Sequence, residues 1–285
     1  MKTYNEITEK IILALERERI PWEKPWVGKP AQNFISKKAY NGINALLLNL
    51  SDFSLPYFAT FKQVSDIGGR ILLGEKSTEV IYWNFIDFLN QETGKLDKIP
   101  FLKTYRVFNL AQCWLPETIK ADIDKELKKI DFKPIEKAQA VFDSYKDKPS
   151  LAENSSKAAY NPVTDIILMP VKNSFSSKEE FYLTLFHEAV HSTGHEKRLD
   201  RESLTAVASF GSHEYSKEEL VAEIGASFLS SHSGIDQKTF SNSVSYCRNW
   251  AEKLRENKKW IFWAAGQAQK ATNYILGIKT EERRK

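Results

Sequence analysis

Hydrophobic residues recur at helical spacing in three separate stretches of the chain. Residues 4–19 place isoleucines and leucines among charged residues, which predicts an amphipathic helix that ends before Pro21. Residues 177–193 are mostly apolar, with polar residues along one face of the predicted helix. Residues 246–278 carry tryptophans and alanines at helical spacing. We therefore expect a helix at the start of the chain and several packed helices in its second half.

Shorter stretches rich in β-branched and aromatic residues predict strands. Residues 70–73, 78–85 and 101–110 have this composition, and glycines bound the first of them as turn signals. Residues 158–170 predict a hairpin with Asn161-Pro162 at its turn. The whole pattern predicts an α+β protein with a small mixed domain first and a helical domain with a short sheet after it.

The second helical stretch contains one HExxH motif, His187-Glu188-Ala-Val-His191. Residues four apart lie on one face of a helix, so both imidazoles can bind a single metal ion. Glu188 is turned about 100° away, which lets its carboxylate accept a proton from a water molecule beside the ion. The alternative is an ordinary half-buried helix. A serine cap at Ser176 or Ser177 and a glycine stop favour the metal site.

A catalytic zinc ion usually takes three protein ligands, so a third is needed. The pattern with a third histidine after the motif is excluded, because Lys197 stands at that position. His195 lies one turn past His191 and could reach the same ion only if the chain doubled back; we consider it instead, with His213 and Tyr215, as a group that stabilises an oxyanion. Zn²⁺ is the expected metal, with Mn²⁺ or another divalent ion as the alternative.

Zinc peptidases of the gluzincin type take their third ligand from a glutamate on a second helix. Residues 216–229 predict such a helix, with Glu219 and Glu223 on one face. We favour Glu219 as the ligand and Glu223 as the residue that orients a histidine. The reverse assignment and a solvated charged face remain open. The strand before the HExxH helix is expected to be the sheet edge that holds an extended peptide.

Composition divides the chain into two parts. All five histidines lie between His187 and His232, whereas four of the seven tryptophans lie in the first 120 residues. We expect an N-terminal domain over 1–147, with a charged helical connector from about residue 116, and a second domain over 148–285. No apolar run is long enough to span a membrane, and Glu6 and Glu9 lie where a secretory signal would need an apolar core, so we expect a cytoplasmic protein with no membrane partner.

Basic and aromatic residues alternate in the first half. Residues 24–62 hold five lysines and one acid with aromatic residues between them, and a similar stretch follows to Trp83. Such alternation is typical of surfaces that bind single-stranded nucleic acid, where cations neutralise phosphates and rings stack on bases. The alternative is that the rings form a core and the lysines a solvated surface. No Walker spacing is present, so we expect no nucleotide cofactor.

Several motifs together resemble the ArdC-type antirestriction proteins. They are Pro21-Trp22-Glu-Lys-Pro-Trp26, Tyr40-Asn-Gly-Ile-Asn44, Phe58-Ala-Thr-Phe-Lys62, Tyr105-Arg-Val-Phe-Asn-Leu110, His187-Glu-Ala-Val-His-Ser-Thr-Gly194, Arg198-Leu-Asp200 and Glu219-Leu-Val-Ala-Glu223. The resemblance covers almost the whole chain. One departure is Ser192 in place of the family's usual tryptophan, which is expected to alter a pocket wall without touching a ligand.

The resemblance implies a single-stranded-DNA-binding domain, related to that of conjugative TraC-type primases, joined to a zincin-like metallopeptidase domain. Such proteins are carried by mobile genetic elements and protect incoming DNA from restriction enzymes. The residues that we expect to contact DNA are Trp22, Lys24, Trp26, Tyr40, Phe58, Phe61, Lys62, Arg70, Lys76, Trp83, Tyr105 and Arg106.

Two hypotheses follow. In the first, a metal ion held by His187, His191 and Glu219 serves peptide hydrolysis, with Glu188 taking a proton from the attacking water; the substrate is then a protein or peptide. In the second, the chain shields DNA without catalysis and the metal-binding domain is a scaffold. Retention of antirestriction after Glu188→Gln would favour the second hypothesis.

Overall fold

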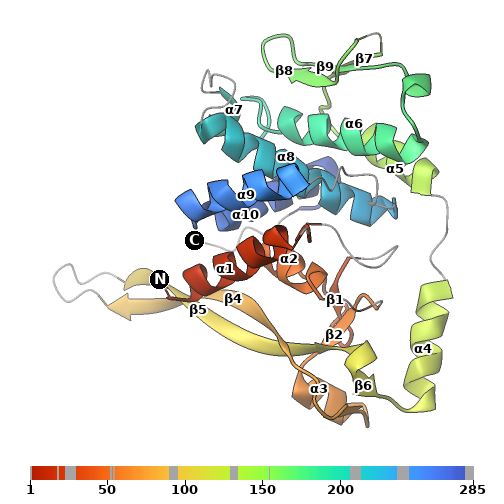
Figure 1. Cartoon of the computed structure of the whole chain (residues 1–285), viewed down its shortest axis with the longest axis vertical. Helices are drawn as coiled ribbons and strands as arrows, with labels where there is room; N and C mark the ends of the chain where they lie inside the picture. The colour runs from red at the N-terminus through yellow and green to blue at the C-terminus, as the bar shows by residue number, and fades with distance from the viewer. Residues whose placement is uncertain are drawn as a thin grey trace.

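The computed structural model describes residues 2–17, 19–22, 30–51, 53, 55–89, 96–128, 134–153, 155–205, 213–235 and 244–279. An N-terminal sheet with its helices lies on one side of a bundle of C-terminal helices, and a small three-stranded sheet lies at the far side of that bundle (Figure 1). None of the helices in these ranges combines the length and the hydropathy that crossing a bilayer requires.

The N-terminal half is built around a four-stranded sheet of order β1-β2-β5-β4. Its strands are β1 (Gln32–Asn33), β2 (Tyr57–Ala59), β4 (Thr78–Leu89) and β5 (Leu96–Asn109). β4 and β5 form a long antiparallel hairpin that begins at the Thr78–Val107 pair. The predicted strands 78–85 and 101–110 are confirmed, and both run further toward the turn because the backbone groups of each strand find partners in the other.

A second, smaller antiparallel ladder joins β3 (Arg70–Ile71) to β6 (Cys113–Trp114). Helix α3 (Phe61–Asp66) packs beside β3. It begins with a capping box, in which the Thr60 side chain accepts the backbone N–H of Gln63 and the Gln63 side chain accepts that of Thr60. Helix α4 (Glu117–Lys128) follows β6. The predicted strand 70–73 is confirmed at its first two residues.

Helices α1 (Lys2–Glu16) and α2 (Ile43–Asn49) lie between this sheet and the C-terminal helices (Figure 1). α1 packs against α9 (Val244–Glu256), whereas α2 packs against both β4 and α10 (Trp260–Ile275). One cluster of buried side chains therefore runs without a break from α1 to α10. α1 ends three residues before the predicted end at residue 19.

The centre of the C-terminal half consists of α6 (Lys178–Ser192), α8 (His213–Ser233) and α10, which pack against one another. The short helix α7 (Glu202–Thr205) packs on α8. Ala251, Leu254, Ile261 and Ala268 are fully buried. The predicted core role of the last helices is confirmed.

Helix α5 (Pro134–Ser144) belongs by its packing to the C-terminal half. It contacts α6, α8 and α10. Ala138 and Phe142 are buried in the same core cluster as the residues of these helices. This packing favours a division of the chain near Pro134, and the boundary at Asp147 stays a prediction.

The small C-terminal sheet has the order β7-β9-β8. The predicted hairpin 158–170 is confirmed as β8 (Ala159–Asn161) and β9 (Ile166–Met169). The expectation that the strand before the HExxH helix is a free edge is wrong, because β7 (Ser150–Glu153) pairs in parallel with the other side of β9. β7 and β8 are the edges.

Candidate metal centre and nucleic-acid surface

Two histidines of α6 and one glutamate of α8 converge on a single point. Ser177 is the N-cap of α6, and its side chain accepts the backbone N–H of Glu180. Of the two predicted caps, Ser177 is therefore confirmed. One ligand atom from each of His187, His191 and Glu219 lies within 4.8 Å of the other two. The Glu219 carboxylate oxygens lie 3.5 Å from Nε2 of His187 and 3.6 Å from Nε2 of His191. This grouping matches the three protein ligands of a catalytic metal site.

The arrangement of the two rings fits a bound cation. Nε2 of His187 and Nε2 of His191 are 3.1 Å apart. Nδ1 of His191 lies 3.2 Å from the Glu218 carboxylate, so it carries the ring hydrogen and leaves a lone pair on Nε2. A lone pair at this distance from another imidazole nitrogen and from a carboxylate needs either a ring hydrogen or a metal ion between them. Two imidazoles and one carboxylate are ligands that suit Zn²⁺ and Mn²⁺.

Glu218 holds His191 in this orientation and is itself held by buried groups. Its carboxylate accepts hydrogen bonds from Nε of Arg201 at 3.1 Å and from the Ser203 hydroxyl at 2.6 Å. Arg201 also donates to the Thr193 hydroxyl at 2.6 Å. Both Glu218 and Arg201 are 4% exposed. A buried carboxylate that fixes the tautomer of a ligand histidine is the expected support of a metal site.

Charge around the site shifts two pKa values. Burial disfavours protonation of His187, but the hydrogen bond with Glu219 and the charges of Glu223, Glu188 and Glu219 raise its pKa to about 9. Burial also disfavours ionisation of Glu218, but the charge and hydrogen bonds of Arg201 and His191 lower its pKa to about 2. In the absence of a metal, a proton on His187 therefore supplies the positive charge that the carboxylates require.

The structure separates the two candidate third ligands. Glu219 lies in the three-residue group, and Glu223 does not. Glu223 is close enough for its charge to raise the pKa of His187. The orienting role that we expected of Glu223 is filled at His191 by Glu218, which the sequence reasoning missed. The geometry favours Glu219 as the ligand, and this assignment stays a prediction.

The structure does not bring His195 into this group. Its Nδ1 accepts the backbone N–H of Lys197 at 3.1 Å, and the side chain is buried. The side chains of His213 and Tyr215 lie outside the described residues. Ser192 is fully buried and its hydroxyl lies 3.1 Å from that of Tyr145. The expectation that this residue alters a pocket wall stays a prediction.

Several predicted DNA-contacting residues of the N-terminal half are exposed. Phe61 is 67% exposed, and Lys62, Arg70 and Lys76 are also exposed. The Arg70 guanidinium lies 4.8 Å from the centre of the Trp114 ring, which is itself exposed and was not predicted. The Arg70 cation and the Trp114 ring thus lie together. Binding of single-stranded nucleic acid needs both, since a cation contacts the phosphate and a ring stacks on a base.

Exposed residues also lie on the β4–β5 hairpin. Tyr105 and Arg106 are exposed, as predicted. Tyr82 packs edge-to-face with Tyr105 at 6.2 Å between ring centres, and the ammonium of Lys103 lies 5.2 Å from the Tyr105 ring. Tyr82 and Lys103 were missed, because only the register of the hairpin places them on the same face as Tyr105.

Two of the predicted DNA-contacting residues belong to the core instead. Trp22 and Phe58 are fully buried, so the prediction that they stack on bases is wrong. The Trp22 ring packs edge-to-face against Trp250, and the Phe58 ring packs in the same way against Tyr40, which is half-buried. Lys24, Trp26 and the side chain of Trp83 lie outside the described residues.

Comparisons with protein families cover both halves. A family described as the N-terminal domain of anti-restriction factor ArdC matches residues 1–108, and one described as a zincin-like metallopeptidase matches residues 136–267. The chain is 32% identical over 98% of its length to a DNA primase TraC of Escherichia coli and 31% identical to a second one. It spans only 27% and 20% of the lengths of these two primases.

Two further relatives match over nearly their whole lengths. The uncharacterized protein y4eC of Sinorhizobium fredii (strain NBRC 101917 / NGR234) is 26% identical, with 99% of this chain and 94% of that protein covered. The metal-free crystal structure of the antirestriction ArdC protein from plasmid R388 has a TM-score of 0.75 and 32% identity, with 96% of this chain and 97% of that chain covered.

The Mn(II)-bound structure of the same R388 protein has a TM-score of 0.73 and 30% identity, with 98% and 99% of the two chains covered. A likeness of this extent includes both the N-terminal sheet and the helices that carry the candidate metal ligands. The chain therefore belongs to the family of ArdC antirestriction proteins.

Proposed function

We propose that this chain protects DNA from restriction by binding single-stranded DNA on its N-terminal half and hydrolysing a peptide bond at a metal centre in its C-terminal half. The observation that supports the centre is the convergence of His187, His191 and Glu219. The R388 relative is an antirestriction protein with a Mn(II)-bound form, which supports both the biological role and a divalent metal.

The roles of the residues follow from their positions. A divalent ion at this centre would act as a Lewis acid on a carbonyl and on water. Glu188 is 7% exposed, and its charge acts on the neighbouring His187; we assign it the acceptance of the proton from the attacking water. The edge strand β8 packs beside α6 and would hold an extended peptide by strand addition.

Metal content tests the ligand assignment. Glu219→Ala should abolish stoichiometric binding of Zn²⁺ or Mn²⁺, since it removes one of three ligands. Glu223→Ala should retain the metal with weaker affinity. Elemental analysis of the purified proteins after dialysis measures both. A Glu219→Ala protein with full metal content, beside a Glu223→Ala protein without it, would reverse the two assignments.

Single-stranded DNA binding is tested at the exposed rings and cations. Trp114→Ala and Tyr105→Ala should each weaken binding by an amount equivalent to about 1–3 kcal/mol, because each removes a stacking surface. Lys62→Gln and Arg70→Gln should reduce the salt dependence of the dissociation constant, because fewer counterions are released. Fluorescence anisotropy at several salt concentrations measures both effects. An affinity that does not change with salt would exclude this surface.

The alternative function is non-catalytic protection of DNA, with the metal-binding domain as a scaffold. Glu188→Gln separates the two, since it keeps the size of the side chain and removes its basicity. If hydrolysis serves antirestriction, the variant should bind metal and DNA normally but fail to protect unmodified DNA entering a restricting host. Full protection by Glu188→Gln, with loss of protection by Trp114→Ala and Arg70→Gln, would establish the scaffold function instead.

A further inference from the structure

Two leucines stand at the tip of the turn that connects β3 to β4. Leu73 is fully exposed, and Leu72 is 45% exposed. In this position they add little to the stability of the fold, because most of their apolar surface stays in water. A polar residue would serve the turn equally well. The reason for two leucines at this tip therefore lies outside the fold itself.

The turn that carries the leucines has a fixed shape. The backbone N–H of Glu75 donates to the carbonyl of Leu72 at 3.3 Å, and Gly74 has a φ of +88°, as the third position of a type II turn requires. The buried side chain of Gln112 donates to the Glu75 carboxylate at 2.8 Å and to the Lys76 carbonyl at 2.9 Å. The tip is thus held outward before any partner binds, which lowers the entropic cost of binding.

The turn continues the outer face of the β3–β6 ladder. Ile71 and Cys113 pair across this ladder and pack against a buried cluster of the N-terminal half. Side chains alternate between the two faces of a strand, so Arg70 and Leu72, on either side of Ile71, leave from the opposite face. Trp114 pairs with Arg70 and shares that face. Exposed apolar groups beside polar ones in this way are typical of an interaction surface.

The charges around the turn suit a phosphate backbone. Arg70 precedes the turn, and the exposed Lys76 follows the leucines. The acid of the turn, Glu75, accepts from Gln112, and its charge adds to burial in raising the pKa of the Cys113 thiol to about 11. Since Cys113 packs on the inner side of the ladder, the charge of Glu75 acts toward that side. The cations at the two ends of the turn therefore remain open to phosphates.

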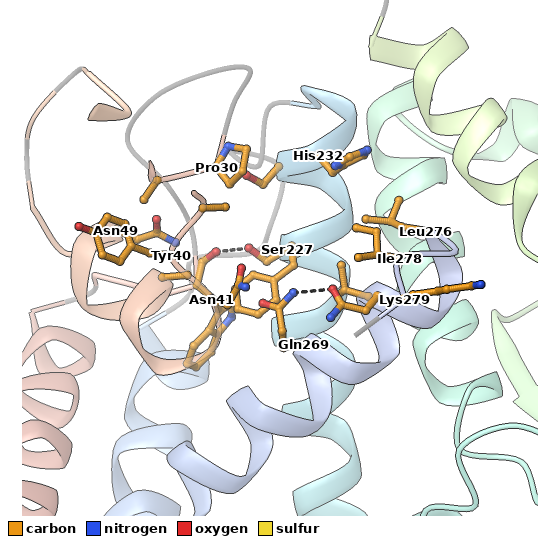
Figure 2. A pocket seen from close by; sticks show the side chains of 18 residues that line it. Pro30, Tyr40, Asn41, Asn49, Ser227, His232, Gln269, Leu276, Ile278 and Lys279 are labelled. Atoms are coloured by element: carbon orange, nitrogen blue, oxygen red, sulfur yellow. Dashed lines mark hydrogen bonds between the residues drawn. The ribbon is translucent and has the colours of Figure 1, made fainter. Parts of the chain in front are cut away.

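A pocket between the two halves of the chain is a less suitable place for a base. Its volume is about 370 Å³, and Tyr40 and Gln269 belong to its wall (Figure 2). The indole Nε1 of Trp22 and the hydroxyl of Thr272, which find no partner in the described parts of the chain, are closed to solvent. A base cannot reach these two atoms, whereas the leucines of the turn are open to the whole face of a base.

We propose that the turn with Leu72 and Leu73 is a wedge that lies against the face of a base of single-stranded DNA. It stands beside the Arg70–Trp114 pair, which stacks on the neighbouring base. Apolar side chains that enter between bases replace one stacking contact and keep the two bases apart. This proposal rests on the proposed binding of single-stranded DNA and adds the contact that keeps the bound strand unstacked.

The test follows the methyl groups of Leu73 in the full-length protein. A ¹³C–¹H correlation spectrum of protein labelled at its leucine and valine methyls shows these groups, and the peaks missing from Leu73→Ser belong to Leu73. A short single-stranded oligonucleotide of mixed sequence should move them saturably upfield, because a methyl group over the face of a base is shielded by its ring current. An abasic strand with the same number of phosphates should not move them upfield.

Affinity measurements on Leu73→Ser give a second readout. The change removes the methyl groups and leaves every charge in place. It should weaken oligonucleotide binding about 5- to 10-fold, because the base covers about half or more of the leucine side chain. The salt dependence of the dissociation constant should not change, since it reports phosphate contacts. Thermal unfolding should match that of wild type, because the side chain is exposed.

Val163→Ser is the matched control. Val163 is an apolar residue, 92% exposed, in the turn between β8 and β9 of the C-terminal half. Its replacement should leave oligonucleotide affinity unchanged, and its methyl peaks should not move upfield with the oligonucleotide.

Leu73 peaks that stay in place while the oligonucleotide moves other peaks would overturn the wedge and leave the DNA-binding function standing. An equal upfield shift with the abasic strand would also overturn it, since the contact would not be with a base. An oligonucleotide that moves no peak would defeat the DNA-binding function and the wedge with it. Unchanged oligonucleotide affinity of Leu73→Ser, with loss of protection against restriction, would assign the turn to a protein partner and overturn the wedge.

Discussion

At the scale of single residues, the buried pair of Glu218 and Arg201 determines how His191 is presented. Glu218 accepts from His191 on one side and from Arg201 and Ser203 on the other. Each of these bonds involves an ionised group in a buried place, where such bonds are strong and a missing partner is costly. The lone pair of His191 therefore points at the candidate centre because of residues outside the HExxH motif.

Glu218→Gln should lower the free energy of unfolding by about 3–5 kcal/mol, because Arg201 is left as a buried charge without its counter-charge. Its metal affinity should fall about 10- to 100-fold. Urea unfolding and a competitive chelator titration at a temperature where the variant is folded measure the two effects. Glu202→Gln, an exposed neighbour of Ser203, is the control and should change stability by less than about 0.5 kcal/mol. Unchanged metal affinity would contradict the role of Glu218.

The ion pair of Asp165 with Arg198 should make the free energy of unfolding fall in acid. Burial disfavours its ionisation, but hydrogen bonds from Arg198 and Tyr160 and the charge of Arg198 lower its pKa below the ordinary value. A lowered folded-state pKa stabilises the fold above the unfolded-state pKa near 3.9, and this contribution disappears as the pH falls through the folded-state pKa. Asp165→Asn should therefore be less stable than wild type at neutral pH.

The stability difference between wild type and Asp165→Asn should shrink as the pH falls from about 6 to about 3. Urea midpoints at several pH values measure it, and taking the difference removes the contribution of the other acids. Asp200→Asn, in which the changed carboxyl is exposed, serves as the control. A difference that stays constant with pH would mean that Asp165 is not ionised in its pair with Arg198.

At the scale of elements, the distance between α6 and α8 determines whether Glu219 can reach the two histidines. The helices pack closely at Gly225, where an added Cβ would lie 2.7 Å from a methyl carbon of Val190. Val190 is fully buried and precedes the ligand His191. A larger residue at 225 would therefore move the two helices apart at the candidate metal centre.

Gly225→Ala should destabilise the protein by about 1–3 kcal/mol and weaken metal binding, since it overpacks the α6–α8 contact. Gly266→Ala on α10 is the matched control, because a Cβ there meets nothing within 4 Å of the described atoms. It should stabilise the protein by about 0.5–1 kcal/mol through helix propensity. Thermal unfolding and chelator titration of both variants check this. A Gly225→Ala protein with unchanged stability and metal affinity would show that the spacing of the two helices at this point does not matter.

At the scale of the whole molecule, the two family domains share one core. Ile11 and Trp22 from the start of the chain are buried in the same cluster as Leu220 of α8 and Trp250 of α9. Side chains that pack in a common cluster lose their contacts together, so the halves should unfold as one unit. Binding at the metal centre should then stabilise the N-terminal helices as well.

Saturating Zn²⁺ or Mn²⁺ should raise the unfolding temperature of the whole chain by several degrees, because a metal at about 100 times its dissociation constant adds about 2.7 kcal/mol. Far-ultraviolet circular dichroism and tryptophan fluorescence should report one coincident transition with and without metal. Glu219→Ala should show no shift. Two separate transitions, of which only one responds to metal, would mean that the shared core does not couple the halves.

The chemistry of the metal centre was largely predictable from sequence, because His187, His191 and Glu219 lie on helices with strong local patterns. Spacing along a helix determines which side chains share a face. The same reasoning missed Glu218. Its partner Arg201 lies in the segment between α6 and α8, and only the folded chain brings the two residues into contact. The same reasoning also predicted Trp22 and Phe58 to be surface residues. Composition alone does not distinguish aromatic residues that stack on bases from aromatic residues that fill a core.

The sequence by itself determined the α+β class, the positions of the long helices and the HExxH face, since these follow from local periodicity. Tertiary packing alone decided three other features: β9 is central, Glu218 orients His191, and Trp22 and Thr272 line one pocket between the halves. Each depends on contacts between segments far apart in the chain. Such contacts leave no periodic signal, because their free energy depends on which surfaces meet after the helices and strands have formed.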